Sequence, residues 1–166
     1  MKKINLQKGT GLAEILVAVS IFSIVLGFLV TASNLYLGGS GESLRNAEGA
    51  YLAQEGIEAV KTIRDANWSN ISSLTAGTNY YLYFDTSSST NNVWKATTTV
   101  SSLSPFARTF KVSAVNRDSN GNIVTTGGSL DANTEKVVVS VSWKSELGNV
   151  IGTTTKTLST YIANIL

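Results

Sequence analysis

The chain contains no cysteine and no histidine. Their absence excludes disulfides, thiolate nucleophiles, imidazole bases and the usual zinc ligands. Among the side chains that remain for chemistry, no pair of carboxylates has a catalytic context, and no glycine-rich loop is of the phosphate-binding kind. We therefore expect no enzymatic activity, no cofactor and no bound metal. A formal charge of +2 over 166 residues is too small to predict nucleic-acid binding.

Charge is also missing from one long apolar run. Residues 15–37 contain no ionisable group except Tyr36, and a single carboxylate, Glu14, stands at their start. At about 1.5 Å per residue, these 23 residues would form a helix of roughly 34 Å, which is enough to span a bilayer. Ser20, Ser23 and Thr31 do not oppose this reading, because a helical hydroxyl can bond to a carbonyl one turn earlier.

The residues before this run are basic. Lys2, Lys3 and Lys8 precede it, and no acidic residue lies among them. Positive charge beside a spanning helix predicts that this end stays in the cytoplasm. We therefore expect three parts: a leader at residues 1–9, a membrane half of a helix at 10–37, and a domain outside the membrane at 38–166.

A second helical pattern follows the glycine-rich stretch Gly38-Gly39-Ser40-Gly41. The glycines would either end the first helix or form a weak point inside a longer one. Apolar residues then recur at steps of three and four, with Arg45, Glu48, Glu55 and Lys61 away from them. This core-facing stripe consists of Leu44, Ala47, Ala50, Ala53, Ile57, Val60 and Ile63. The pattern predicts one helix over 11–64, packed on a core through the stripe.

The remainder of the chain has the pattern of a β-sheet. Aromatic, β-branched and alternating segments predict strands at 80–84, 93–100, 106–115, 135–144 and 153–162. The inward-facing sets would be Phe106, Phe110, Val112 and Ala114 on one strand and Val137, Val139, Val141 and Trp143 on another. The expected fold class is α+β, with the long helix packed on an antiparallel sheet.

The segment 117–122 permits two readings. Asp118, Asn120 and Asn122 are spaced like the start of a calcium loop, but Gly121 falls between the second and third of them and no glutamate follows at the required distance. The Asn120-Gly121 pair is typical of a hairpin turn. We expect the turn.

The stretch Lys8-Gly9-Thr10-Gly11-Leu12-Ala13-Glu14, followed by the apolar run, resembles the N-terminal signature of type IV prepilins and type II secretion pseudopilins. That signature is a basic leader ending in glycine, then four residues, then glutamate, then an apolar helix. The resemblance implies that a prepilin peptidase cuts between Gly9 and Thr10 and that Thr10 is then N-methylated. This chain departs from the family in having Thr10 where phenylalanine is usual.

The resemblance also implies a role for Glu14. A lone carboxylate in the apolar layer is costly, by about 2.5–3.5 kcal/mol on insertion scales. The cleaved chain would carry a positively charged amine on Thr10, and Glu14 of one subunit would neutralise the amine of a neighbour when helices pack together. The alternative is that Glu14 lies in the headgroup region beside Lys8.

The leading functional hypothesis is a pilin-like structural subunit that is stored in the inner membrane with its domain outside and is then assembled into a surface filament. Its partners would be other pilin or pseudopilin subunits, the prepilin peptidase, and an assembly platform with its ATPase. A pilus, a DNA-uptake filament and a secretion pseudopilus are equally compatible with it. The alternative is a secreted β-rich binding domain, cut by signal peptidase after Val30-Thr31-Ala32, or a domain that stays singly anchored.

Overall fold

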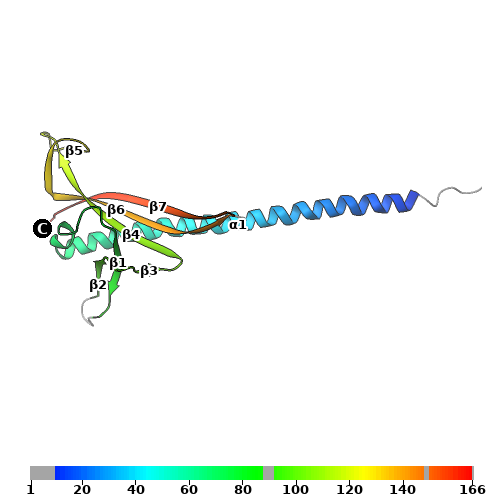
Figure 1. Ribbon diagram of the computed structural model, residues 1–166, viewed down its shortest axis with the longest axis horizontal. Coiled ribbons are helices and arrows are strands. Elements are labelled where there is room, and N and C mark those ends of the chain that lie inside the picture. Colours follow the sequence, from blue (N-terminus) through cyan, green and yellow to red (C-terminus); the bar gives the residue numbers. More distant parts are fainter. Residues whose placement is uncertain (1–9, 88–91, 148–149, 166) are drawn as a thin grey trace, which may run out of the picture.

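The computed structural model describes residues 10–87, 92–147 and 150–165. Figure 1 shows one long helix, α1, that projects beyond the rest of the fold for much of its length and then passes along a β-sheet at the other end of the molecule. Helix α1 extends from Thr10 to Ala66, close to the predicted 11–64. The glycines at 38, 39 and 41 lie inside it, so they are a weak point within one helix and not its end.

The sheet contains seven antiparallel strands among the described residues, with the main order β2-β1-β4-β6-β7 and with β3 and β5 paired only to β4. The strands are β1 Tyr80–Asp85, β2 Val93–Thr97, β3 Ser102–Leu103, β4 Phe106–Arg117, β5 Ile123–Val124, β6 Ser129–Leu147 and β7 Val150–Ala163. A short helix, α2, spans Ser69–Ser72. The predicted α+β fold is thus confirmed, and all five predicted strands are present. The strands β3 and β5 were not predicted.

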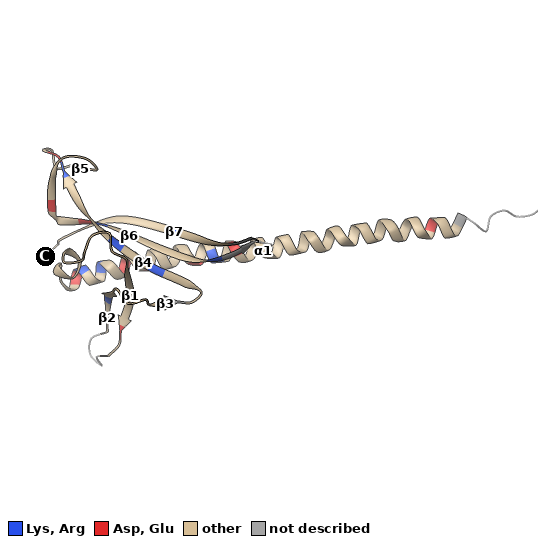
Figure 2. Ribbon diagram, viewed as in Figure 1, with Lys and Arg blue, Asp and Glu red and all other residues tan. Residues whose placement is uncertain are grey.

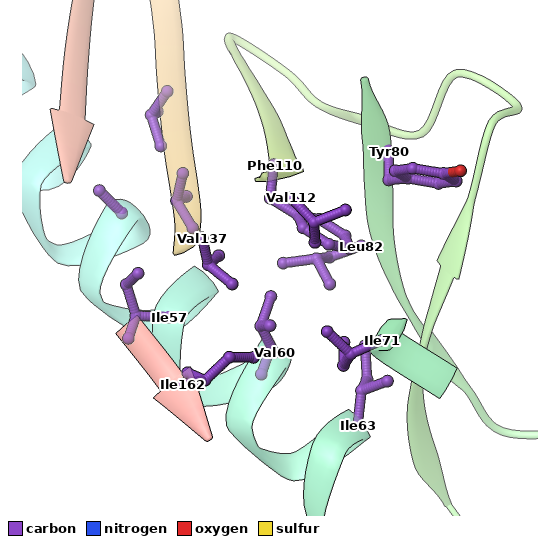
Figure 3. Packing of buried hydrophobic residues seen from close by; sticks show 14 of the residues in the cluster. Ile57, Val60, Ile63, Ile71, Tyr80, Leu82, Phe110, Val112, Val137 and Ile162 are labelled. Carbon is purple, nitrogen blue, oxygen red and sulfur yellow. The ribbon is translucent and has the colours of Figure 1, made fainter. Parts of the chain in front are cut away.

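The core lies between α1 and one face of the sheet. Val137, Val139 and Val141 of β6 are fully buried, as the alternation in the sequence predicts. Figure 3 shows Val60 of α1 beneath this layer, with Ile57 and Ile162 on one side of the cluster and Leu82 and Tyr80 on the other. Burial of a large aliphatic side chain contributes about 1.5–3 kcal/mol, so this cluster fastens the sheet to the helix.

The predicted stripe on α1 is right at one end and wrong at the other. Ala53, Ile57, Val60 and Ile63 are buried, but Leu44, Ala47 and Ala50 are exposed. Leu44 and Ala53 are nine residues apart, which is two and a half turns at about 3.6 residues per turn. Repeated steps of three therefore carry the stripe to the opposite side of the helix.

Two glycines and an arginine occupy the sheet-facing side in this region instead. A Cβ on Gly49 would lie 2.5 Å from Cζ3 of Trp143, and one on Gly56 would lie 2.8 Å from Cγ1 of Val139. The glycines let the helix approach β6 closely. Arg45, predicted to face away, is half-buried and donates from Nη1 to the carbonyl of Lys144 at 3.3 Å.

The predicted inward face of β4 is also wrong at its last residue. Phe106, Phe110 and Val112 are buried, but Ala114 is exposed and Val115 is buried in its place. The register between β4 and β6 shifts between Ala114 and Val115. Such a bulge turns the following side chains to the other face.

The segment after β4 forms the predicted turn. Asn116 and Arg117 pair with Val124 and Ile123, and Gly121 has a φ of +82°. The Asp118 carboxylate accepts the backbone N–H groups of Asn120 and Asn122 at 2.9 and 2.8 Å. These bonds lower the pKa of Asp118, with those from Asn122 contributing most.

Because Gly49 lies so close to Trp143, alanine should destabilise the domain at position 49 but not at a glycine with open space around it. Gly49→Ala in the fragment 38–166 should lower the free energy of unfolding by about 1–3 kcal/mol, because the buried ring of Trp143 must shift. Gly41→Ala is the matched control, since a Cβ there meets nothing within 4 Å. It should stabilise the helix by up to about 1 kcal/mol. Urea unfolding of both variants checks this, and equal effects would contradict the packing described.

The environment of Asp131, which lies beyond the bulge on β6, predicts that the free energy of unfolding depends on pH. A hydrogen bond from Thr134 and the Arg117 guanidinium, with Nε 2.7 Å from Oδ2, lower the pKa of Asp131 from 3.8 to about 2. A depressed carboxyl pKa stabilises the folded state above the unfolded value. This contribution should be lost as the pH falls from about 4 to about 2. Asp131→Asn should lower the unfolding free energy of fragment 38–166 at pH 6 and converge with the parent near pH 2. Parallel pH curves would refute the assignment.

Candidate membrane-spanning and assembly helix

No other part of the chain that the structure describes packs against the first half of α1. Every residue from 11 to 41, called the stem here, is exposed. Large apolar side chains such as Leu12, Phe28 and Leu37 are about two-thirds exposed or more. A helix that is apolar on all sides is found inside a large assembly or within a membrane.

The stem is long enough and apolar enough to span a membrane, and it is the one such helix in the described part of the chain. At about 1.5 Å per residue, residues 11–41 extend roughly 46 Å, more than the hydrocarbon thickness of about 30 Å. The excess places the domain clear of any bilayer that the stem crosses.

The hydroxyl groups of Ser20, Ser23 and Thr31 are satisfied within the helix, as predicted. Ser20 donates to the carbonyl of Leu16 at 2.7 Å, Ser23 to that of Val19 at 2.8 Å, and Thr31 to that of Gly27 at 2.9 Å. These bonds remove the cost of placing a free hydroxyl in an apolar medium.

Glu14 is the only charged residue of the stem. Figure 2 shows one acidic position near the start of α1 and then no charge until the helix reaches the sheet. Glu14 is exposed, and within the described residues no ion pair to it occurs. Thr10 is the first residue of α1, one helical turn before Glu14, while Gly9 and the basic leader lie outside the described residues. No other residue that the structure describes therefore offers Glu14 a charged partner.

The space beside three glycines of the stem is unoccupied. A Cβ at Gly27, Gly38 or Gly39 would meet nothing within 4 Å. No contact inside the single chain therefore requires glycine at these positions, in contrast to Gly49. Small residues on an apolar helix permit close approach of another helix.

One residue that fastens the domain to α1 was not predicted. Arg108 of β4 is 2% exposed, and its Nη1 lies 3.0 Å from Oε2 of Glu55 and donates to the carbonyl of Leu52 at 3.1 Å. Its guanidinium lies 5.4 Å from the ring centre of Trp94. The signal was available, because Arg108 alternates with the inward-facing Phe106 and Phe110.

Nothing in the described residues indicates a catalytic or metal centre. No group of three or more acidic side chains there has a metal-binding arrangement. The unpartnered apolar stem, with Glu14 near its start, is therefore the candidate functional feature.

Comparisons with protein-family models, with curated proteins and with solved structures returned no match.

Proposed function

We propose that this chain is a structural subunit of a type IV pilus-like or pseudopilus filament. A prepilin peptidase cuts it between Gly9 and Thr10, and it assembles through the stem. The observation that carries the proposal is the fully exposed apolar stem, continuous in one helix with the domain and charged only at Glu14. The resemblance of residues 8–14 to the prepilin signature supports it independently.

The proposal requires two different environments to cover the stem, one before assembly and one after it. Before assembly the subunit lies in the inner membrane, with lipid around the stem and the domain outside. In the filament, stems of other subunits replace the lipid. Because both media are apolar, the transfer exposes little new apolar surface to water, and the driving force must come from packing and paired charges. An assembly platform and its ATPase would supply the work of extraction.

Glu14 then sets the axial position of each subunit. On cleavage, Thr10 gains a positive amine at the end of the same helix. Pairing of Glu14 with the amine of a neighbour neutralises both groups in the apolar interior, where an unpaired charge is costly. Other axial offsets leave both groups unpaired.

Processing is the first prediction for this function. Co-expression with a prepilin peptidase should yield a chain that begins at Thr10, and Gly9→Leu should abolish the cut. Intact-mass measurement of the membrane-extracted protein checks both. A mature chain that begins at Ser33 would instead support the secreted domain cut by signal peptidase.

Glu14→Gln separates assembly from processing, because it keeps the side-chain size and removes the charge. The chain should still be cut and should remain in the membrane, while its incorporation into sheared filaments should fall sharply. Removal of one partner of a buried charge pair can destabilise by about 3–5 kcal/mol. Glu14→Asp keeps the charge with a shorter reach and should be intermediate. Immunoblots of sheared and membrane fractions measure both pools, and normal incorporation of the glutamine variant would overturn the pairing.

A further inference from the structure

An apolar groove with an acidic border runs along one flank of α1 where the helix passes the sheet. It has a volume of about 430 Å³ and is lined by Leu44, Ala47, Glu48, Tyr51, Leu52 and Glu55. Leu44 and Tyr51 are 70% and 74% exposed. These are large apolar side chains that the sheet does not cover.

The groove faces the β2 side of the domain. Glu55, at one end of it, pairs with Arg108 of β4, and the guanidinium of Arg108 lies over Trp94 of β2. Strand β2 is one edge of the main sheet order, and β7 is the other. The groove and β7 are therefore on opposite flanks of α1.

On the opposite flank, the exposed edge of strand β7 is complementary to the groove. Lys156 and Leu158 pair across the ladder with Val141 and Val139, so their side chains are on the face of the sheet that packs on α1. The two valines are fully buried, but Leu158 is 43% exposed and Lys156 is exposed. The last strand thus extends past the helix and leaves an apolar and a basic side chain uncovered.

Each of these two surfaces carries a charged side chain for which the described part of the chain supplies no ion pair. Among the described residues neither Glu48 nor Lys156 is in an ion pair, whereas the nearby acids Glu55 and Glu58 pair with Arg108 and Lys61. One flank therefore presents apolar surface with a free carboxylate, and the other presents apolar surface with a free ammonium group.

We propose that the groove of one copy binds the β7 edge of a second copy, with Leu158 against Tyr51 and with Lys156 beside Glu48. This inference rests on the proposed filament function, and it identifies the lateral contact between domains. Because the two surfaces are different and lie on opposite flanks, a copy that binds through its groove keeps its β7 edge free, and its partner keeps its groove free. Such a contact is heterologous and extends into an open chain of subunits.

The register of the contact follows from the packing of β6 on α1. Trp143 lies against Gly49, and Val139 lies against Gly56. Val141 and its neighbour Lys156 are therefore level with the middle of that helical segment, about four to five residues beyond Glu48. At about 1.5 Å per residue, neighbouring subunits would be offset by roughly 7 Å along the helix axis. This is a stagger of little more than one turn.

The absence of cysteine makes cross-linking a direct test. The full-length Glu48→Cys/Lys156→Cys variant should give a ladder of disulfide-linked multimers when sheared filaments are mildly oxidised, because each subunit contributes both ends of the contact. The matched control is Glu48→Cys/Lys111→Cys. Lys111 is exposed on the opposite face of the sheet, so this variant should stay monomeric on non-reducing gels.

A second pair of variants tests the charges without cysteine. Glu48→Lys and Lys156→Glu alone should each reduce filament yield several-fold, and the two together should restore it. Filaments that form normally but give no ladder, or an equal ladder from the Lys111 control, would overturn this contact while leaving the filament function intact. Failure of the double charge exchange to restore yield would also overturn it. Absence of the unaltered chain from all sheared fibres would instead overturn the proposed function.

Discussion

The apolar stem is the constraint on which the rest of the molecule depends. A helix that presents large aliphatic side chains on all sides is unfavourable in water, and none of the residues that the structure describes covers residues 11–41. The hydroxyl groups of Ser20, Ser23 and Thr31 bond to the helix's own backbone, and Glu14 is the one charged side chain of the stem. A membrane and a bundle of identical stems would each cover the apolar surface. The proposed function uses both in turn, which would account for a stem that is neither shorter nor amphipathic.

The domain and the stem share one continuous helix. Helix α1 does not end with the stem but continues under the sheet, where Gly49 and Gly56 allow Trp143 and Val139 to approach it closely. The buried Arg108 ties β4 to the helix carbonyl of Leu52 and to Glu55. A force applied to the stem would thus pass directly into the sheet. The glycines at 38, 39 and 41 make bending between the stem and the domain inexpensive, since each glycine weakens a helix by about 1 kcal/mol relative to alanine.

Much of this arrangement can be predicted from the sequence, and the failures have physical causes. The long apolar run and the alternation of Val137, Val139 and Val141 are local patterns, and each gave the correct element. The predicted stripe was wrong at Leu44 because residues spaced by three move progressively around a helix. The side of α1 that packs on the sheet is set by Gly49 and Gly56, and glycine has no side chain that a hydrophobic pattern could reveal. Ala114 failed because the register shift arises from extra residues in β6, between Asp131 and Glu135, and not from anything in β4 itself. The groove and the β7 edge depend on where the sheet ends over α1, which only the assembled fold determines.

A helical reconstruction of sheared filaments by electron cryomicroscopy tests the central claim most directly. The account predicts that stems of this chain occupy the filament axis, that the sheets form the outer surface, and that the carboxylate of Glu14 lies within about 4 Å of the terminal amine of Thr10 in a neighbouring subunit. Filaments in which the stems are absent, or in which Glu14 has no amine from a neighbour, would contradict it.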